Sequence, residues 1–325
     1  MDSLINYFST LNPSTFVAAL PGNVAQGIIW GLMALGVFIT YKLLNFADLT
    51  VDGSFATGGA VTAILLMNGA PVWLATLAAL GAGILAGLIT GILHTVLGIP
   101  DILAGILTQI ALYSVNLNIM GKSNLPVSYR NYSLILSASN IPHAILIGLV
   151  LSAVIICLMY WYFGTEQGST IRSTGSNPAM SKAQGINISV AKVIALSLSN
   201  GLVAVSGSLF SQYQGFADVN MGRGAIVIGL AAVIIGSVIG GAIFRKHMNF
   251  IIKLLFVIIG GILYYISMGI VIWLKMPTDD TKLFTAVIVA IFLAFPYLKD
   301  KSKNSFKKVA KQNLKNLNKE AETDA

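Results

Sequence analysis

Several apolar runs in this chain are long enough to cross the hydrocarbon core of a membrane, and this feature restricts the possible folds most. A membrane-spanning helix needs about 20 mainly apolar residues, and the runs at 72–97, 142–164 and 188–213 reach that length. The chain is 56% hydrophobic and only 10% charged, whereas a soluble domain carries about 25% charged residues. A membrane β-barrel is excluded, because its strands would be about half as long and would alternate polar with apolar residues.

We therefore predict an all-α polytopic membrane protein with about nine transmembrane segments, within a range of eight to ten. Residues 1–298 would form the transmembrane domain, and the basic tail 299–325 holds eight lysines against four acids. Because lysine and arginine favour the cytoplasmic side, we expect this tail and the polar loop at 165–187 to be cytoplasmic. Anionic membrane lipid is an expected contact of the tail, and nucleic acid is not an expected partner. The predicted segments are 23–44, 53–68, 72–97, 101–121, 142–164, 188–213, 222–243, 250–274 and 282–298.

A short repeat suggests that the chain consists of two related halves. Asn45-Phe46-Ala47-Asp48 follows the first span and Gly215-Phe216-Ala217-Asp218 follows the sixth, and a glycine and a short apolar segment come after each motif. The halves would cover about 23–121 and 188–298, joined by a linker span at 142–164. An offset of five spans inverts the second half, and inverted repeats with broken helices near a central pathway recur in transporters.

The polar loop at 165–187 contains a compact helix signal. Asn177 can cap the first free amides with its side-chain oxygen, and Pro178 suits the first helical position. Gly185 can adopt the left-handed conformation that ends a helix. This helix has little apolar surface of its own, so we expect it to lie against a partner protein. The alternative is an ordinary capped helix in a loop between spans.

Enzymatic motifs are missing from the sequence. There is no Walker A pattern, no HExxH and no GxSxG, and the three histidines are scattered at positions 94, 143 and 247. We expect no catalytic residues, no metal site and no cofactor bound by this chain. The single cysteine, Cys157, forms no disulfide within the chain and no cysteine metal site.

Polar residues near membrane depth are the candidate functional groups, because charges there are costly and usually functional. Asp48 and Asp52 are four residues apart and share one helical face. With Asn45 they are candidates for a gate or pathway wall, the alternative being that Asp52 caps the second span at the membrane surface. The pathway candidates among the amides, which could instead bond a neighbouring helix, are Gln109, Asn116 and Asn200.

Two further charges are candidates for the external face of the protein. Asp218 ends the second copy of the repeat motif, and Arg223 lies between Gly222 and Gly224, just outside the seventh segment. Arg223 is a candidate contact for a solute carboxylate or a delivery protein, and an interfacial anchor is the alternative.

These motifs resemble those of a known family, the permease subunits of bacterial ABC importers of the branched-chain amino acid and ribose type. Gly175-Ser176-Asn177-Pro178 and Gly185-Ile186-Asn187 resemble the coupling helix of these subunits. The motif at 45–48 and the stretch 212–222 match two further family motifs. Residues 49–55 and 103–108 resemble a subgroup linked to tryptophan or tyrosine import. The resemblance covers most of residues 20–298.

The resemblance implies a subunit of an importer in the bacterial plasma membrane, which moves a small solute, such as an aromatic or branched-chain amino acid. A homodimer or a paired permease would bind two ATPase subunits, which hold the ATP, and an extracellular substrate-binding lipoprotein. Family members often carry an alanine pair after the Asn-Pro, where this chain has Ala179 followed by Met180. The alternatives are an ion-coupled secondary transporter and a non-transporting scaffold subunit. The implied coupling residues are Gly175, Asn177, Pro178, Ala179, Lys182, Gly185 and Ile186.

Overall fold

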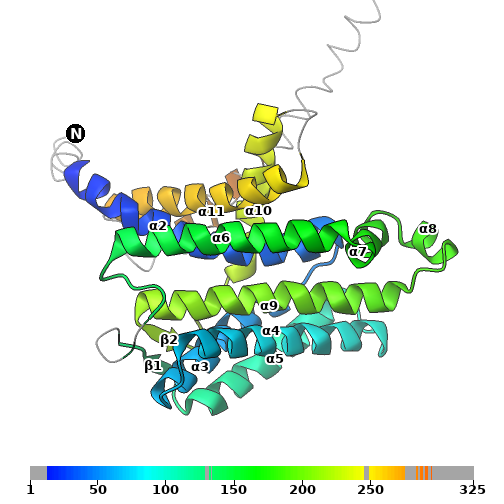
Figure 1. Cartoon of the computed structure of the whole chain (residues 1–325), viewed down its shortest axis with the longest axis horizontal. Coiled ribbons are helices and arrows are strands. Elements are labelled where there is room, and N and C mark those ends of the chain that lie inside the picture. Colours follow the sequence, from blue (N-terminus) through cyan, green and yellow to red (C-terminus); the bar gives the residue numbers. More distant parts are fainter. Residues whose placement is uncertain are drawn as a thin grey trace, which may run out of the picture.

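The chain folds as a bundle of long helices with two short strands at one end (Figure 1). The computed structural model describes residues 13–128, 132, 134–244 and 249–274, with further single positions between 283 and 294. The elements are α2 (Pro13–Phe38), the π-helix η1 (Ile39–Leu43), α3 (Thr50–Met67), α4 (Val72–Thr95), α5 (Asp101–Met120), β1 (Asn124–Pro126), α6 (Ile141–Gly164), α7 (Glu166–Ser176), α8 (Pro178–Ala183), α9 (Ile188–Gln214), β2 (Phe216–Asp218), α10 (Ala225–Phe244) and α11 (Phe250–Trp273).

Eight helices within the described residues are long and apolar enough to cross a membrane. The predicted all-α polytopic class is therefore confirmed, whereas the count of nine is not, because the ninth segment at 282–298 lies largely outside the described residues. The tail 299–325 lies wholly outside them. The first span is longer than predicted, since it begins at Pro13 and not at residue 23 and includes Pro21. Proline is tolerated inside membrane helices, where neighbouring groups satisfy the freed backbone.

Two antiparallel helices, α2 and α9, form the centre of the bundle. The hydroxyl of Ser206 donates a hydrogen bond to the Ile29 carbonyl at 2.6 Å. Near the other end, Ser199 donates to the Gly36 carbonyl at 2.7 Å. The backbones approach closely there, because a Cβ atom on Gly36 would lie only 2.7 Å from the Ser199 carbonyl oxygen. Small residues thus allow the two longest helices to pack as the core.

Two other helices, α3 and α10, begin inside the bundle and not at its ends. Helix α3 runs parallel to α9, since Ser54 bonds Asn200 and Thr62 bonds Ser208, each at 2.7 Å. Helix α10 packs on α2, where Gly229 faces Val37. The chain reaches the start of α3 through the irregular residues 44–49 and the start of α10 through the turn at 219–224.

Helices α4 and α11 also pack on the central pair, and the division into two inverted halves stays a prediction. Helix α4 packs antiparallel on α9, with Gly83 against Asn200 and Gly87 against Leu196. Helix α11 packs antiparallel on α2 in the same way, with Gly27 against Ile262. Each predicted half therefore lays its second and third helices on the first helix of the other half. The irregular stretch before α3 lies at 44–49, and Gly53 lies inside α3.

The two ends of the bundle carry different structures (Figure 1). One end has the strands β1 and β2, which pair antiparallel with Asn124 opposite Asp218. The other end has α7 and α8. Neither the strands nor α7 was predicted. Helix α7 starts at the cap residue Thr165 and buries Ile171, so it takes up half of the loop that the sequence reading assigned to one short helix.

Candidate functional site

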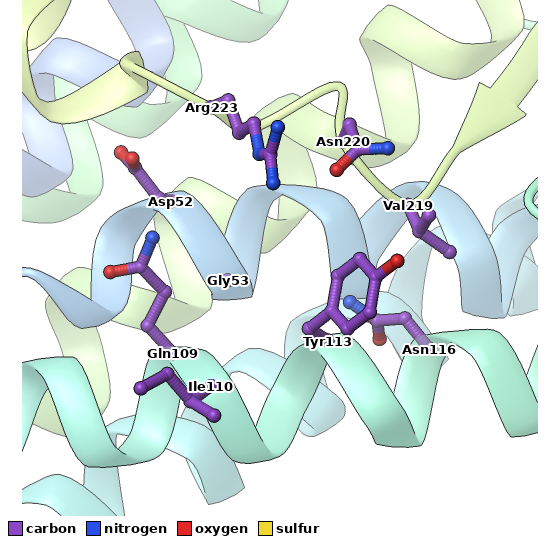
Figure 2. Close-up of a pocket in the computed structure, with 9 residues that line it drawn as sticks. All are labelled: Asp52, Gly53, Gln109, Ile110, Tyr113, Asn116, Val219, Asn220 and Arg223. Carbon is purple, nitrogen blue, oxygen red and sulfur yellow. The ribbon is translucent and has the colours of Figure 1, made fainter.

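A cavity of about 270 Å³ lies among α3, α5 and the turn that leads into α10. Figure 2 shows Arg223 and Asn220 pointing from this turn, and Gln109 and Tyr113 pointing from α5, toward the same space. Four of the residues picked from the sequence therefore come together here. The lining consists of Asp52, Gly53, Gln109, Ile110, Tyr113, Asn116, Val219, Asn220 and Arg223.

This cavity lies near the middle of the membrane-spanning length. Ser54 is two residues after Asp52 and bonds Asn200. Asn200 is the thirteenth of the 27 residues of α9, counted from Ile188. Because α9 spans the bundle, its central residue marks the middle depth, and Asp52 lies close to that depth. Polar groups are costly there and are commonly part of a solute or ion pathway.

Asp52 caps the start of α10. Its two carboxylate oxygens accept hydrogen bonds from the backbone N–H groups of Gly224 and Ile226, each at 2.9 Å. The first turn of a helix carries free amides and a partial positive charge, which a carboxylate satisfies. The sequence offered two interpretations of Asp52, a gate or pathway wall and a cap of the second span. In the structure Asp52 lines a cavity and also caps a helix, but that helix is α10, whose Gly224 is 172 residues further along the chain.

Arg223 lies in a turn that folds back into the bundle. The sequence suggested a role at the external face, which stays a prediction, and the structure places the neighbouring Gly224 against Asp52. The physical reason is that Asp52 offers an acceptor for the α10 amides at middle depth. Asp218, by contrast, stays at the strand end of the bundle, where its Oδ2 accepts from Asn124 at 3.3 Å.

Two polar groups of the cavity lack a side-chain partner and are notable for their burial or charge, Asn116 and Arg223. Asn116 is 0% exposed, yet among the described residues neither its Nδ2 nor its Oδ1 has a hydrogen-bond partner. Within the part of the chain that the structure describes, the exposed Arg223 side chain forms no hydrogen bond or ion pair. Buried polar groups are nearly always satisfied in proteins, so an unpaired amide here suggests that a ligand or water completes it.

Asp48 and Asn200 form a second polar cluster, which does not line the cavity. Asn200 donates to Asp48 Oδ2 at 2.7 Å and accepts from Ser54 at 2.7 Å. The Thr50 backbone N–H donates to Asp48 Oδ1 at 2.9 Å. The Asp48 side chain is only 2% exposed, so Thr50 and Asn200 supply the hydrogen bonds that a buried carboxyl group needs. The cluster fastens the start of α3 to the middle of α9.

Asn45, the remaining pathway candidate, lies at the surface in the irregular residues 44–49. Its φ of 54° is the only positive value of a non-glycine residue among the described positions, and asparagine tolerates that conformation better than most residues.

The sequence reading missed Tyr113, Ile110 and Asn220 as lining residues. A usable signal was present for Tyr113, because Gln109, Tyr113 and Asn116 recur at the spacing of one helical face. Asn220 had no comparable signal, since its turn enters the cavity only through tertiary structure.

Helix α8 presents a second candidate surface at the opposite end from the strands. Asn177 Oδ1 accepts from the Met180 N–H at 3.0 Å, as the sequence predicted for a cap. Gly185 has φ of 81°, and the Ile186 N–H bonds the Ser181 carbonyl at 3.1 Å, which is the expected helix stop. The side chains exposed on this surface include Pro178, Ala179, Met180 and Lys182.

Gly175 has a different position from the other predicted coupling residues. It lies in α7, and a Cβ atom there would overlap the Leu43 carbonyl oxygen, so it allows α7 to pack against η1. Movement of the α7–α8 segment would therefore be transmitted directly to the end of the first span.

Comparison with known proteins gives consistent results. A family profile described as "Branched-chain amino acid transport system / permease component" matches residues 22–296. A tyrosine transport system permease protein of Clostridioides difficile (strain R20291) is 42% identical over 83% of this chain and 89% of its own length. An uncharacterized protein of Rickettsia prowazekii (strain Madrid E) is 32% identical over 83% of this chain and 94% of its own length. The galactofuranose transporter permease protein YtfT of Escherichia coli (strain K12) is 28% identical over 68% and 64%, respectively.

Proposed function

The chain belongs to the family of branched-chain amino acid transport system permease components, and on that premise we propose that it is the membrane-spanning permease subunit of an ATP-driven amino acid importer. The 42% identity to a permease named for tyrosine transport favours an aromatic amino acid as solute. The observation that carries the proposal is the polar cavity at middle depth, between two helices that begin inside the bundle.

In this mechanism, ATP is bound and hydrolysed by separate ATPase subunits at the α7–α8 end, which would be cytoplasmic. Their closure moves α8, and α7 passes the movement to η1 through the close contact at Gly175. The two halves then rock about the α2–α9 pair and open the cavity to alternate sides. An external binding protein delivers the solute at the strand end, where Asp218 lies. This chain contributes no catalytic group and no cofactor.

A second permease copy would cover the cavity side of the subunit. Ile110 and Tyr113 on α5 are 63% and 44% exposed, and they border the same cavity as the exposed Arg223. An arginine at middle depth is costly when it faces lipid, whereas it is tolerated beside a polar pathway between two subunits. We therefore place the dimer axis next to α5 and the start of α10, with the solute passing between the copies.

The buried Asp48 carboxyl is an observation that favours a second candidate function, transport driven by a proton gradient. In that case Asp48 would bind and release the proton, and no ATPase subunit would be needed. Uptake by vesicles that contain this chain alone decides between the two functions.

The test is uptake by proteoliposomes that contain the permease, its ATPase subunits and its binding protein. We expect L-tyrosine to enter only when ATP is present, and ATP-independent uptake by the permease alone would overturn the proposal. Gly185→Val should abolish uptake without loss of expression, because the valine strains the turn that ends α8. Gly69→Val is the matched control. Gly69 has φ of 80° and Gly185 of 81°, and an added Cβ would meet no atom within 4 Å at either position.

A further inference from the structure

The cavity lining holds one carboxylate and one guanidinium group, and only the carboxylate is hydrogen-bonded within the described chain. Asp52 is the only lining carboxylate among the described residues, and both of its oxygens are already bonded to the start of α10. Arg223 has no such partner in the described chain, and its side chain points into the cavity (Figure 2). A guanidinium group is planar and presents paired donors that match a carboxylate. The missing partner is therefore an anionic group of the solute.

The second unpaired group restricts the solute further. Asn116 is fully buried and offers one acceptor and two donors that nothing in the described chain uses. It lies on the same face of α5 as Gln109, whose amide also reaches the cavity. Amide oxygens can accept from an ammonium group. A neutral sugar would leave the arginine unpaired at middle depth, and a simple anion would leave the amide acceptors unused.

We infer that this cavity is a solute-recognition site of the permease itself. Arg223 binds the α-carboxylate of an amino acid, and the side-chain amide of Asn116 bonds its α-ammonium group. The inference rests on the proposed function. It assigns selection to the permease as well as to the external binding protein, so a solute that lacks a carboxylate would pass poorly even after delivery.

Two other roles for Arg223 do not fit the structure. An interfacial anchor would lie at an end of the bundle, whereas Arg223 lies in a turn that is bonded to Asp52 at the start of α3, near middle depth. A structural ion pair would need an acid within reach, and Asp52, which lines the same cavity, forms no ion pair with it.

The first experiment measures ATP-dependent L-tyrosine uptake by the complete reconstituted complex. We expect Arg223→Gln to lower uptake by roughly tenfold or more, since a site built for a polar group discriminates strongly against its loss. Arg223→Lys should retain an intermediate rate, because it keeps the charge without the paired donors. Lys253→Gln removes a cation that does not line the cavity and should leave uptake unchanged. Uptake by Arg223→Gln within twofold of wild type would overturn the inference.

The second experiment does not depend on uptake or on the folding of a variant. The melting temperature of the detergent-solubilised wild-type permease is measured with millimolar L-tyrosine, L-tyrosinamide or tyramine. Stabilisation by L-tyrosine alone supports the carboxylate site, and equal stabilisation by all three compounds, or by none, contradicts it. Failure of the proposed function looks different, because wild-type complexes would then show no ATP-dependent uptake of L-tyrosine, whatever residue stands at position 223.

Asn116→Leu provides a further independent readout. If the amide is only an unsatisfied buried group, leucine should raise the melting temperature and leave uptake unchanged, and that result would contradict its role in binding. If the amide binds the solute, the same variant should remain as stable as wild type or become more stable, while uptake falls by roughly tenfold.

Discussion

Replacing Asn200 with leucine tests whether the cluster around Asp48 holds the start of α3 in place. The substitution keeps the side-chain volume similar but removes two hydrogen bonds of 2.7 Å, one to Asp48 and one from Ser54. Both partners are buried, at 2% exposure for Asp48 and 0% for Ser54. A buried polar group that loses its partner costs about 1–3 kcal/mol, and more when it is charged.

Two such groups give a loss of about 2–6 kcal/mol in the free energy of unfolding. Hydrogen bonds between membrane helices average only about 0.6 kcal/mol, with a maximum near 1.7, because the unfolded reference state in lipid also finds partners. We therefore expect a loss near the lower end of this range, about 2 kcal/mol, which corresponds to a fall of roughly 3 °C in melting temperature for a chain of 325 residues.

The assay is the apparent melting temperature in detergent at one scan rate, followed by tryptophan fluorescence. Asn118→Leu is the matched control, because Asn118 is exposed and donates only to Ser114 of its own helix. We expect this control to shift the melting temperature by less than about 1 °C, as most surface changes do. Adding Asp48→Asn to Asn200→Leu should recover part of the loss, because it removes the charge of a buried carboxylate whose Oδ2 has lost its donor and which keeps only the bond from Thr50. Equal shifts for Asn200→Leu and Asn118→Leu would refute the assigned role of the cluster.

Two further predictions concern packing and capping. Gly87→Ala should lower the free energy of unfolding by about 1–3 kcal/mol, because its Cβ would overlap the Leu196 carbonyl oxygen. Gly81→Ala on the same helix meets nothing within 4 Å and is the control. Chemical denaturation compares the two variants, and equal stabilities would contradict the packing. Asp52→Ala should lower the free energy of unfolding by about 0.5–2 kcal/mol, because the first amides of α10 lose their acceptor. Amide hydrogen exchange at Gly224 should become faster, and unchanged exchange would disprove the cap.

The position of two helix starts inside the bundle explains why the cavity is polar at middle depth. The helices α3 and α10 both start there, so the free amides of both starts need acceptors away from water. Asp48 supplies an acceptor to α3 within its own segment, and Asp52 supplies acceptors to α10 from the other half of the chain. The two halves are thus joined through the same carboxylates that the sequence marks as unusual.

The membrane class and the ends of the short helix α8 could be predicted from the sequence alone. The cost of burying each residue in lipid depends on its own side chain, so apolar runs report spans without knowledge of their neighbours. The cap at Asn177 and the stop at Gly185 involve groups within a few residues of each other. Local chemistry also identified Asp52, Gln109, Asn116 and Arg223 as polar groups in apolar surroundings.

Only the tertiary structure decided which of these groups meet. Asp52 and Gly224 are 172 residues apart, and no local pattern shows that the second turn folds back to middle depth. Because of this long-range contact, Arg223 reaches the cavity, whereas Asp218, five residues earlier, stays at the strand end. Asn200 likewise pairs with Asp48 and not with the cavity. Pairings between distant segments depend on the packing of whole helices, and that packing is set by many small contacts that no single stretch of sequence contains.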